Sequence, residues 1–136
     1  MLSDAELKEL LVHATTIAVV GAKDTPGQAV DTVGRYLMDA GYTVIPVHPK
    51  RQEVWGLKTF PSITAVDQPI HIVDLFRASQ YCDEHATETT ILRPLPLCFW
   101  MQLGVRNETA KQLLAKGPVK VVEDRCIMRE HGRLFP

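Results

Sequence analysis

The segment Thr16-Ile-Ala-Val-Val-Gly21 decides the fold, because it is a short run of β-branched and small apolar residues that ends in glycine. An apolar run of this length without alternation is typical of a strand buried on both faces, as in a parallel sheet. After a loop that contains glycine and proline, Val30, Val33 and Leu37 mark the apolar face of a helix. Gly41 stands where a C-cap glycine would end that helix. The order strand, loop, helix predicts the first βα unit of a parallel sheet.

The same alternation extends in both directions from this unit. Ser3 and Glu6 have the spacing of a capping box, which predicts a helix over residues 4–14. A helix is also expected over 79–93, and another after Asn107, which can act as its N-cap. Further apolar runs predict four more strands, over 43–48, 71–76, 96–101 and 120–123. Alternating strands and helices with right-handed crossovers imply a three-layer α/β/α sandwich around a five-stranded parallel sheet.

Pro46 is an unusual residue for the strand predicted over 43–48, because it has no N–H to donate to a neighbouring strand. Within sheets, proline is found at edge strands or beside bulges. We expect a bulge at this position.

The composition is that of one ordinary globular domain over residues 1–136. Lys and Arg number 15 against 16 Asp and Glu, so the formal net charge is −1, and 46% of the residues are hydrophobic. This near-neutral charge provides no overall basic field for nonspecific binding of nucleic acid or anionic lipid. We therefore expect a small-molecule nucleotide ligand and no nucleic-acid or membrane partner, with monomer and homodimer both open.

No segment predicts membrane insertion, secretion or metal binding. The longest apolar stretches, 17–22 and 95–101, fall well short of the roughly 20 residues that span a bilayer. The acidic N-terminus lacks the basic and apolar regions of a secretory signal, so a cytoplasmic location is expected. Three cysteines without CxxC spacing and five histidines without HxxxH spacing favour reduced thiols and no bound metal.

Ligands of open parallel sheets bind outside the carboxyl ends of the strands, so the residues after each strand are the candidate site. The loop Gly21-Ala22-Lys23 continues to Gly27 and leads into a helix N-terminus, where amide groups and the helix dipole favour a phosphate. Lys23 adds a positive charge. The loop lacks the GxGxxG spacing, so an ordinary tight turn remains the alternative.

The second strand is followed by His48-Pro49-Lys50-Arg51, where NAD-binding sheets usually place a carboxylate for the ribose hydroxyls. Lys50 and Arg51 favour instead a nucleotide with an extra ribose phosphate. NADP and coenzyme A (CoA) both carry one. The alternative is two solvated basic residues on a loop.

The later strands are also followed by candidate ligand-binding residues. Phe76 and Arg77 could frame an adenine, Gln102 offers an amide, and Gly104 allows close approach of the backbone. Cys126 follows the fifth strand and is either a reactive thiol or an inert packing residue. No Ser/His/Asp order, paired catalytic carboxylates or nucleophile elbow is present, so binding is better supported than catalysis.

Taken together, several segments resemble the small stand-alone CoA-binding domain proteins, which are relatives of the CoA-binding domain in the succinyl-CoA synthetase α subunit. The segments are Ile17–Ala22, Gly41–Lys50, Val54–Gly56, Phe60–Ile63, Ile72–Arg77, Trp100–Val105 with Asn107-Glu108, and Asp124–Cys126. The resemblance implies a Rossmann-like fold that binds CoA. It places the family's phosphate loop on Gly21 and Ala22, its Pro-Lys pair on Pro49 and Lys50, and a further wall on Phe76 and Arg77.

The chain departs from the family pattern at some of these positions. Lys23 stands where members usually have Ser, and His48 where they usually have Asn. The loop 24–31 lacks the Arg-Pro-Ser pattern common in the family, and segment 83–95 also differs. These departures predict phosphate contacts that are rearranged, or weaker, relative to other members.

The resemblance predicts a noncatalytic protein that binds CoA or an acyl-CoA as a carrier, sensor or regulatory subunit. Compared with the synthetase subunit, we expect no second domain that would supply a ligase reaction, and hence no acyl-CoA synthesis by this chain alone. The alternatives are an NADP-binding oxidoreductase module, a redox module in which Cys126 bonds to the CoA thiol, and a degenerate fold kept for protein contacts.

Overall fold

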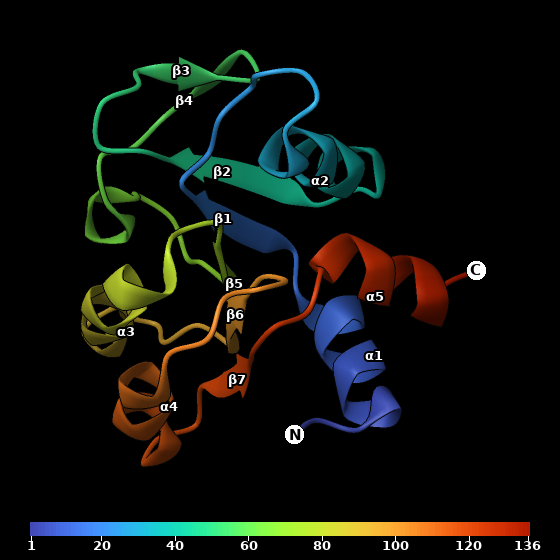
Figure 1. Ribbon diagram of the computed structural model, residues 1–136, viewed down its shortest axis with the longest axis vertical. Helices are drawn as coiled ribbons and strands as arrows, with labels where there is room; N and C mark the ends of the chain where they lie inside the picture. The colour runs from blue at the N-terminus through green and yellow to red at the C-terminus, as the bar shows by residue number, and fades with distance from the viewer.

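Five parallel strands form the central sheet, in the order β2-β1-β5-β6-β7 (Figure 1). The computed structural model describes residues 1–136. The strands are β1 (Thr16–Val20), β2 (Thr43–Val47), β5 (Ile72–Leu75), β6 (Cys98–Met101) and β7 (Lys120–Val122). Every residue of β1, β5 and β6 is buried, as expected for the central strands of a sheet covered on both faces. The predicted three-layer α/β/α, Rossmann-like fold with a five-stranded parallel sheet is confirmed.

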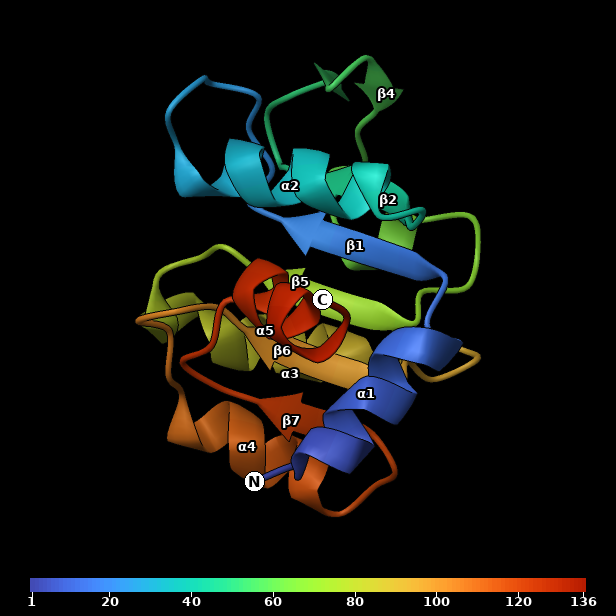
Figure 2. The same cartoon turned by 90° about the vertical axis from the view of Figure 1, so that its right-hand side faces the viewer.

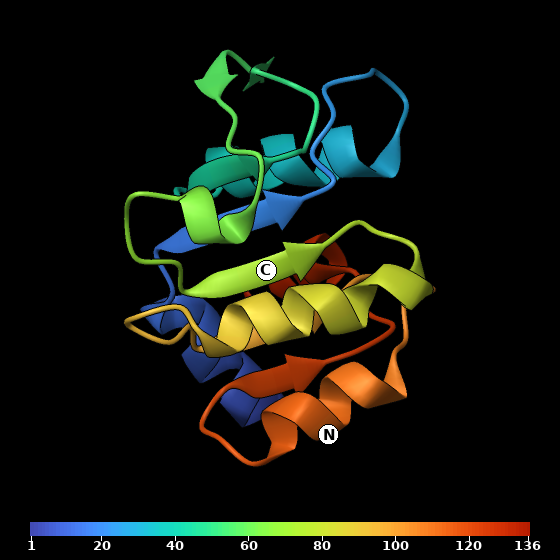
Figure 3. The same ribbon diagram turned by 90° about the vertical axis from the view of Figure 1, so that its left-hand side faces the viewer.

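Helices cover both faces of the sheet. They are α1 (Asp4–His13), α2 (Ala29–Asp39), α3 (Cys82–Thr90), α4 (Glu108–Ala115) and α5 (Ile127–Leu134), with short 3-10 helices η1 (Ile63–Ala65) and η2 (Ser79–Tyr81). Helices α1, α2 and α5 lie on one face (Figure 2), and α3 and α4 on the other (Figure 3). Each face has its own apolar core, the first around Trp100 and the second around Phe99. None of these helices combines the length and the apolar character that a membrane crossing requires.

The predicted helix caps are present. The Glu6 N–H donates to Ser3 Oγ at 3.2 Å, and the Ser3 N–H donates to Glu6 Oε1 at 3.1 Å, which completes the capping box of α1. At the start of α4, the Ala110 N–H donates to Asn107 Oδ1 at 2.8 Å. Gly41 follows the C-cap of α2 with a φ of 100°, in the left-handed region that favours glycine.

The bulge expected at Pro46 is absent. Pro46 pairs with Val19 in an uninterrupted register along β2. Strand β2 is an edge strand of the sheet, and the Pro46 carbonyl accepts the Phe60 N–H at 3.1 Å on the side away from β1. The nitrogen of Pro46 faces the same outer side, so the ladder with β1 loses no hydrogen bond.

Residues 51–58, which we call the strap, contain no strand or helix that the sequence analysis predicted. They contain a small antiparallel hairpin of β3 (Glu53–Val54) and β4 (Leu57–Lys58), which projects beyond β2. Trp55 lies at its turn with a φ of 56°, an unusual backbone conformation for a bulky residue. The Trp55 Nε1–H donates to Asp31 Oδ1 of α2 at 2.8 Å, and the indole lies against Gly34. The strap is therefore docked on helix α2.

A fully buried carboxyl group lies in the middle of the sheet. Asp74 of β5 is in register with Val19 on one side and Trp100 on the other. Its residue exposure is 0%, and neither side-chain oxygen has a hydrogen-bond partner in the protein. Burial raises the pKa of this carboxyl well above its usual value, because the charged form loses its hydration.

A Gly34→Ala substitution tests the docking of the strap. A Cβ at this position would overlap the Trp55 indole, so we expect a loss of about 1–3 kcal/mol in unfolding free energy. In a Trp55→Leu background the overlap is relieved, and the same change should be nearly neutral or stabilising because alanine favours helix. Urea unfolding of the four proteins in this cycle measures the coupling. Equal losses in both backgrounds would contradict the docked position of Trp55.

An Asp74→Asn substitution tests the buried carboxyl. Because its folded pKa is raised, the folded protein keeps a proton that the unfolded chain releases above about pH 4. The stabilisation from this proton is complete below the unfolded pKa and is lost as the pH rises through the folded pKa. Relative to the asparagine variant, the wild type should therefore lose about 1.4 kcal/mol for each pH unit in this interval.

Urea unfolding between pH 5 and pH 8 measures this difference. Asp67→Asn, at an exposed loop position, serves as the control and should show no such slope. A constant difference between the Asp74 variant and the wild type would show that Asp74 does not titrate as expected.

Candidate functional site

A cavity of about 560 Å³ lies at the carboxyl ends of the strands. Its walls come from the loop after β1, the start of α2, the segments after β5 and β6, and the start of α5. The lining residues are Gly21, Lys23, Gln28, Ala29, Val30, Thr32, Val33, Phe76, Arg77, Gln102, Leu103, Val105, Cys126, Met128 and Arg129. Three of them are cations and none is a carboxylate, so the cavity favours an anionic ligand.

A second cavity, of about 550 Å³, lies beside α1 at the opposite edge of the sheet. It is lined by leucines and prolines together with Glu6 and Glu9, and by none of the residues expected to bind a nucleotide. The first cavity is therefore the candidate site.

Gly21 forms the tight end of β1. Its φ is 84°, and a Cβ at this position would overlap the carbonyl oxygen of Phe76. Only glycine allows the loop after β1 to pass this close to the end of β5. The amides of Gly21 and Ala22 both donate to the Val47 carbonyl, at 2.9 and 3.2 Å. These two amides are thus engaged within the protein, and any backbone contact with a phosphate must come from later in the loop.

Four cations lie near enough to His48, which follows β2 directly, to act on its charge. The pKa of His48 is lowered by partial burial first, and then by the positive charges of Arg51, Lys23, Arg77 and Lys50. The Lys50 N–H donates to His48 Nδ1 at 3.0 Å, so the neutral ring carries its proton on Nε2. We call Lys23, Lys50, Arg51 and Arg77 the cation cluster. They converge from three separate loops.

The members of the cation cluster differ in their contacts. Arg51 pairs with Asp24, with 3.3 Å between Nη1 and Oδ1. Arg77 lies over the Tyr81 ring at 4.5 Å from its centroid, and its Nε is buried without a hydrogen-bond partner. Lys23 and Lys50 form no ion pair, and Lys50 is exposed. These two lysines are the cations most readily available to an incoming anion.

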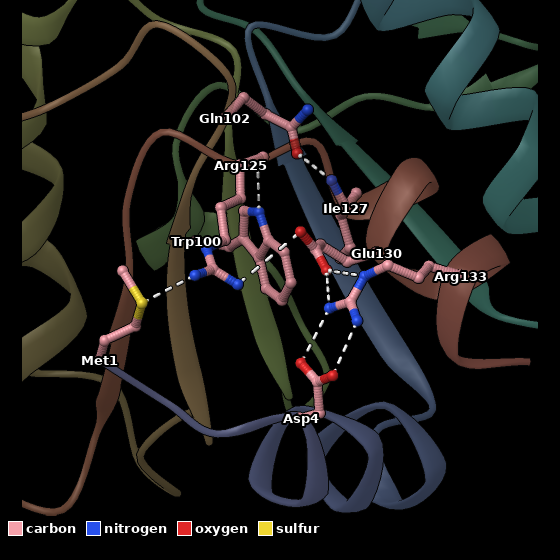
Figure 4. A network of polar contacts seen from close by, with 8 residues as sticks. All are labelled: Met1, Asp4, Trp100, Gln102, Arg125, Ile127, Glu130 and Arg133. Atoms are coloured by element: carbon pink, nitrogen blue, oxygen red, sulfur yellow. Dashed lines mark hydrogen bonds and ion pairs between the residues drawn. The ribbon is translucent and has the colours of Figure 1, made fainter.

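Gln102 and α5 close the cavity on its far side. Gln102 is buried, and its Oε1 accepts the Ile127 N–H at 3.1 Å at the first turn of α5 (Figure 4). The Trp100 Nε1–H donates to the Arg125 carbonyl at 2.8 Å, which fixes the residue before Cys126. The oxygen of Gln102 is therefore committed to α5, and only its amide nitrogen is left for a ligand.

The other end of α5 is tied to α1. Arg133 of α5 forms a bidentate pair with Asp4, at 2.8 and 3.0 Å, and also pairs with Glu130 (Figure 4). The hydrogen bond from Arg133 lowers the pKa of Asp4. Residues 129 positions apart thus hold the helix that carries part of the cavity wall.

Gly104 lies outside the cavity lining, although its neighbours Leu103 and Val105 belong to it. The Gly104 N–H donates to Asp124 Oδ1 at 2.7 Å, and Arg106 Nη2 lies 2.6 Å from Asp124 Oδ2. These contacts, the backbone bond first, lower the pKa of Asp124. The Gly104 amide is bound by Asp124. The close backbone approach expected at Gly104 is therefore to another part of the protein, and not to a ligand.

The structure thus brings together most of the residues selected from the sequence. Five line the cavity: Gly21, Lys23, Phe76, Arg77 and Gln102. Ala22 is buried behind them, and His48, Pro49 and Lys50 lie on the adjoining loop after β2. Met128 and Arg129 of α5 were missed. The helical spacing of Ile127, His131 and Leu134 was the available signal.

Comparisons with known proteins agree with this arrangement. Residues 15–132 match the family described as CoA binding domain. The chain is 40% identical over 130 residues to the uncharacterised protein YneT of Bacillus subtilis (strain 168), covering 96% of this chain and 95% of YneT. A solved structure of a hypothetical protein from Pyrococcus horikoshii OT3 superposes with a TM-score of 0.94 at 33% identity, over 99% of this chain and 94% of that one.

A more distant similarity reaches an enzyme. The chain is 29% identical over 69 residues to an ADP-forming acetate–CoA ligase of Methanocaldococcus jannaschii, over 51% of this chain and 10% of the ligase. The family match extends from the start of β1 into α5 and includes every wall of the cavity. On this evidence, the chain belongs to the CoA-binding domain family.

Proposed function

We propose that this protein binds CoA or an acyl-CoA at the carboxyl edge of its sheet, without catalysis of its own, as a carrier, sensor or regulatory subunit. The cation cluster is the observation that carries the proposal. Its four side chains come from the loops after β1, β2 and β5, two of them line the cavity, and all four lie near enough to His48 to lower its pKa. CoA bears a pyrophosphate and a ribose phosphate, and so needs several cations at one edge of the protein.

The cavity has a cationic wall and an apolar wall, which suit the phosphorylated nucleotide end and the uncharged pantetheine end of CoA. Lys23 and Arg77 line the cavity near the loop after β1, where the pyrophosphate would lie. Lys50 lies farther out, after β2, where a nucleotide's ribose is usually held in related sheets. The apolar wall from Val30, Val33 and Met128 would receive the uncharged pantetheine arm.

Calorimetric titration with CoA, dephospho-CoA, NADP and NAD tests the proposal. We expect the wild type to bind CoA more tightly than the other three. Because a charge-assisted hydrogen bond contributes about 1.5–3 kcal/mol, Lys50→Ala should weaken CoA binding by roughly tenfold or more and leave dephospho-CoA binding nearly unchanged. Lys116→Ala removes the same charge from the end of α4 and should have no effect.

The alternatives predict different titrations. Preference for NADP would support an oxidoreductase module instead. Heat from none of the four ligands would support a fold kept for protein contacts. Equal losses of CoA and dephospho-CoA affinity in Lys50→Ala would show that Lys50 does not bind the ribose phosphate.

Cys126 supports a second candidate function, thiol exchange with a CoA disulfide. Its side chain is half-buried and lines the same cavity as Lys23 and Arg77, at the start of α5. The thiolate of Cys126 would attack one sulfur of a CoA disulfide. The new S–S bond would join Cys126 to CoA, and the second CoA would leave as a thiolate that takes up a proton.

Intact-mass measurement after incubation with CoA disulfide tests this exchange. We expect one CoA added per chain, and its release by a reductant. Cys82 and Cys98 are buried, and burial raises the pKa of Cys82 to about 11, so neither should react. Cys126→Ser should abolish the adduct, whereas Cys82→Ser should not. An adduct that persists in Cys126→Ser would exclude this role.

A further inference from the structure

The strap contacts the loop after β1 through the side chain of Asp24. Asp24 lies in the loop after β1, directly after Lys23. Its Oδ1 faces Arg51 Nη1 at 3.3 Å, and its Oδ2 accepts the Trp55 N–H at 3.2 Å. Both partners belong to the strap. Asp24 therefore links the loop expected to bind phosphate to the strap.

Asp24 is the only carboxylate that pairs with the cation cluster. Lys23, Lys50 and Arg77 form no ion pair, whereas Arg51 is paired. The side chains of Arg51 and Asp24 are 37% and 38% exposed, so the pair is reached by solvent and is weak. A phosphate dianion offers a guanidinium more charge and two oxygens, and so is a stronger partner.

We propose that Asp24 is a resident anion that competes with the ligand's ribose phosphate for Arg51 and thereby lowers the affinity of the site. The inference rests on the proposed CoA binding and adds its regulation. Without ligand, Asp24 holds Arg51 in place beside Lys50. When the phosphate arrives, Arg51 exchanges one anion for the other.

The strap keeps Asp24 in place after Arg51 has left it. The Trp55 amide still donates to Oδ2, and Trp55 itself is fixed by the hydrogen bond to Asp31 and by contact with Gly34. Asp24 therefore stays close to the bound phosphate as an uncompensated charge. Its repulsion adds to the cost of breaking the pair, and both lower the affinity.

Removing the charge of Asp24 should tighten binding. In Asp24→Asn the amide oxygen can still accept the Trp55 N–H, so the strap is retained. At about 50 mM salt, where screening is modest, we expect calorimetric titration to show CoA affinity higher by roughly five- to tenfold. Dephospho-CoA, which lacks the ribose phosphate, should gain about twofold or less. Glu53→Gln removes one charge from an exposed position of the same strap and should change neither affinity.

A double-mutant cycle tests whether the effect acts through Arg51. In an Arg51→Gln background the competition is absent, and Asp24→Asn should increase CoA affinity by about twofold or less. An undiminished gain in this background would show that Asp24 acts by repulsion alone, and would overturn the competition. Thermal unfolding of each variant checks that the strap is intact.

The possible failures can be told apart. If the wild type binds CoA but Asp24→Asn binds it equally well or more weakly, this inference is wrong and the proposed function stands. A folded wild type that binds no CoA overturns both. If Asp24→Asn increases the affinities for CoA and dephospho-CoA equally, the inference about Asp24 is also overturned, because the competing group would then not be the ribose phosphate.

Discussion

The close passage of the chain at Gly21 is the constraint on which the rest of the site depends. Here the loop leaves β1 so near the Phe76 carbonyl that a side chain would not fit. The amides of Gly21 and Ala22 bind the Val47 carbonyl of β2, and the Phe76 N–H donates to Val20 of β1 at 2.9 Å. The ends of β1, β2 and β5 are thus joined within a few ångströms. Three loops with different sequences consequently open onto one edge, where their cations meet.

Charge organises what these loops can bind. The chain as a whole is nearly neutral, yet Lys23, Lys50, Arg51 and Arg77 lie at one edge of the sheet. Partial burial lowers the pKa of His48 most, and these four charges lower it further. One carboxylate, Asp24, partly neutralises this positive charge through its ion pair with Arg51. A cluster of cations with a single internal anion is suited to reversible binding of a polyanion, because repulsion among the cations is relieved by the ligand and only partly by the protein.

Two elements that are remote from the first βα unit complete the site. The strap reaches the loop after β1 through Trp55 and Arg51, and α5 reaches the cavity through Gln102 and Cys126. Helix α5 is also anchored to the N-terminus of the chain, where Asp4 pairs with Arg133 (Figure 4). The cavity wall is therefore held from both of its ends, which is consistent with a site formed before the ligand binds.

By itself, the sequence determined the order of the five sheet strands and of helices α1 to α4, the caps at Ser3 and Asn107, and most of the loops that form the site, but not helix α5 or the hairpin of the strap. These depend on periodicity and on contacts between residues a few positions apart, which a linear pattern records. The tertiary structure alone decided that Pro46 lies on the outer side of an edge strand, that Gln102 accepts a hydrogen bond from the first turn of α5, and that Asp24 forms an ion pair with Arg51. Each of these depends on which segments the sheet order brings together, and hydrogen bonds and ion pairs across such distances leave no periodic signal in the chain.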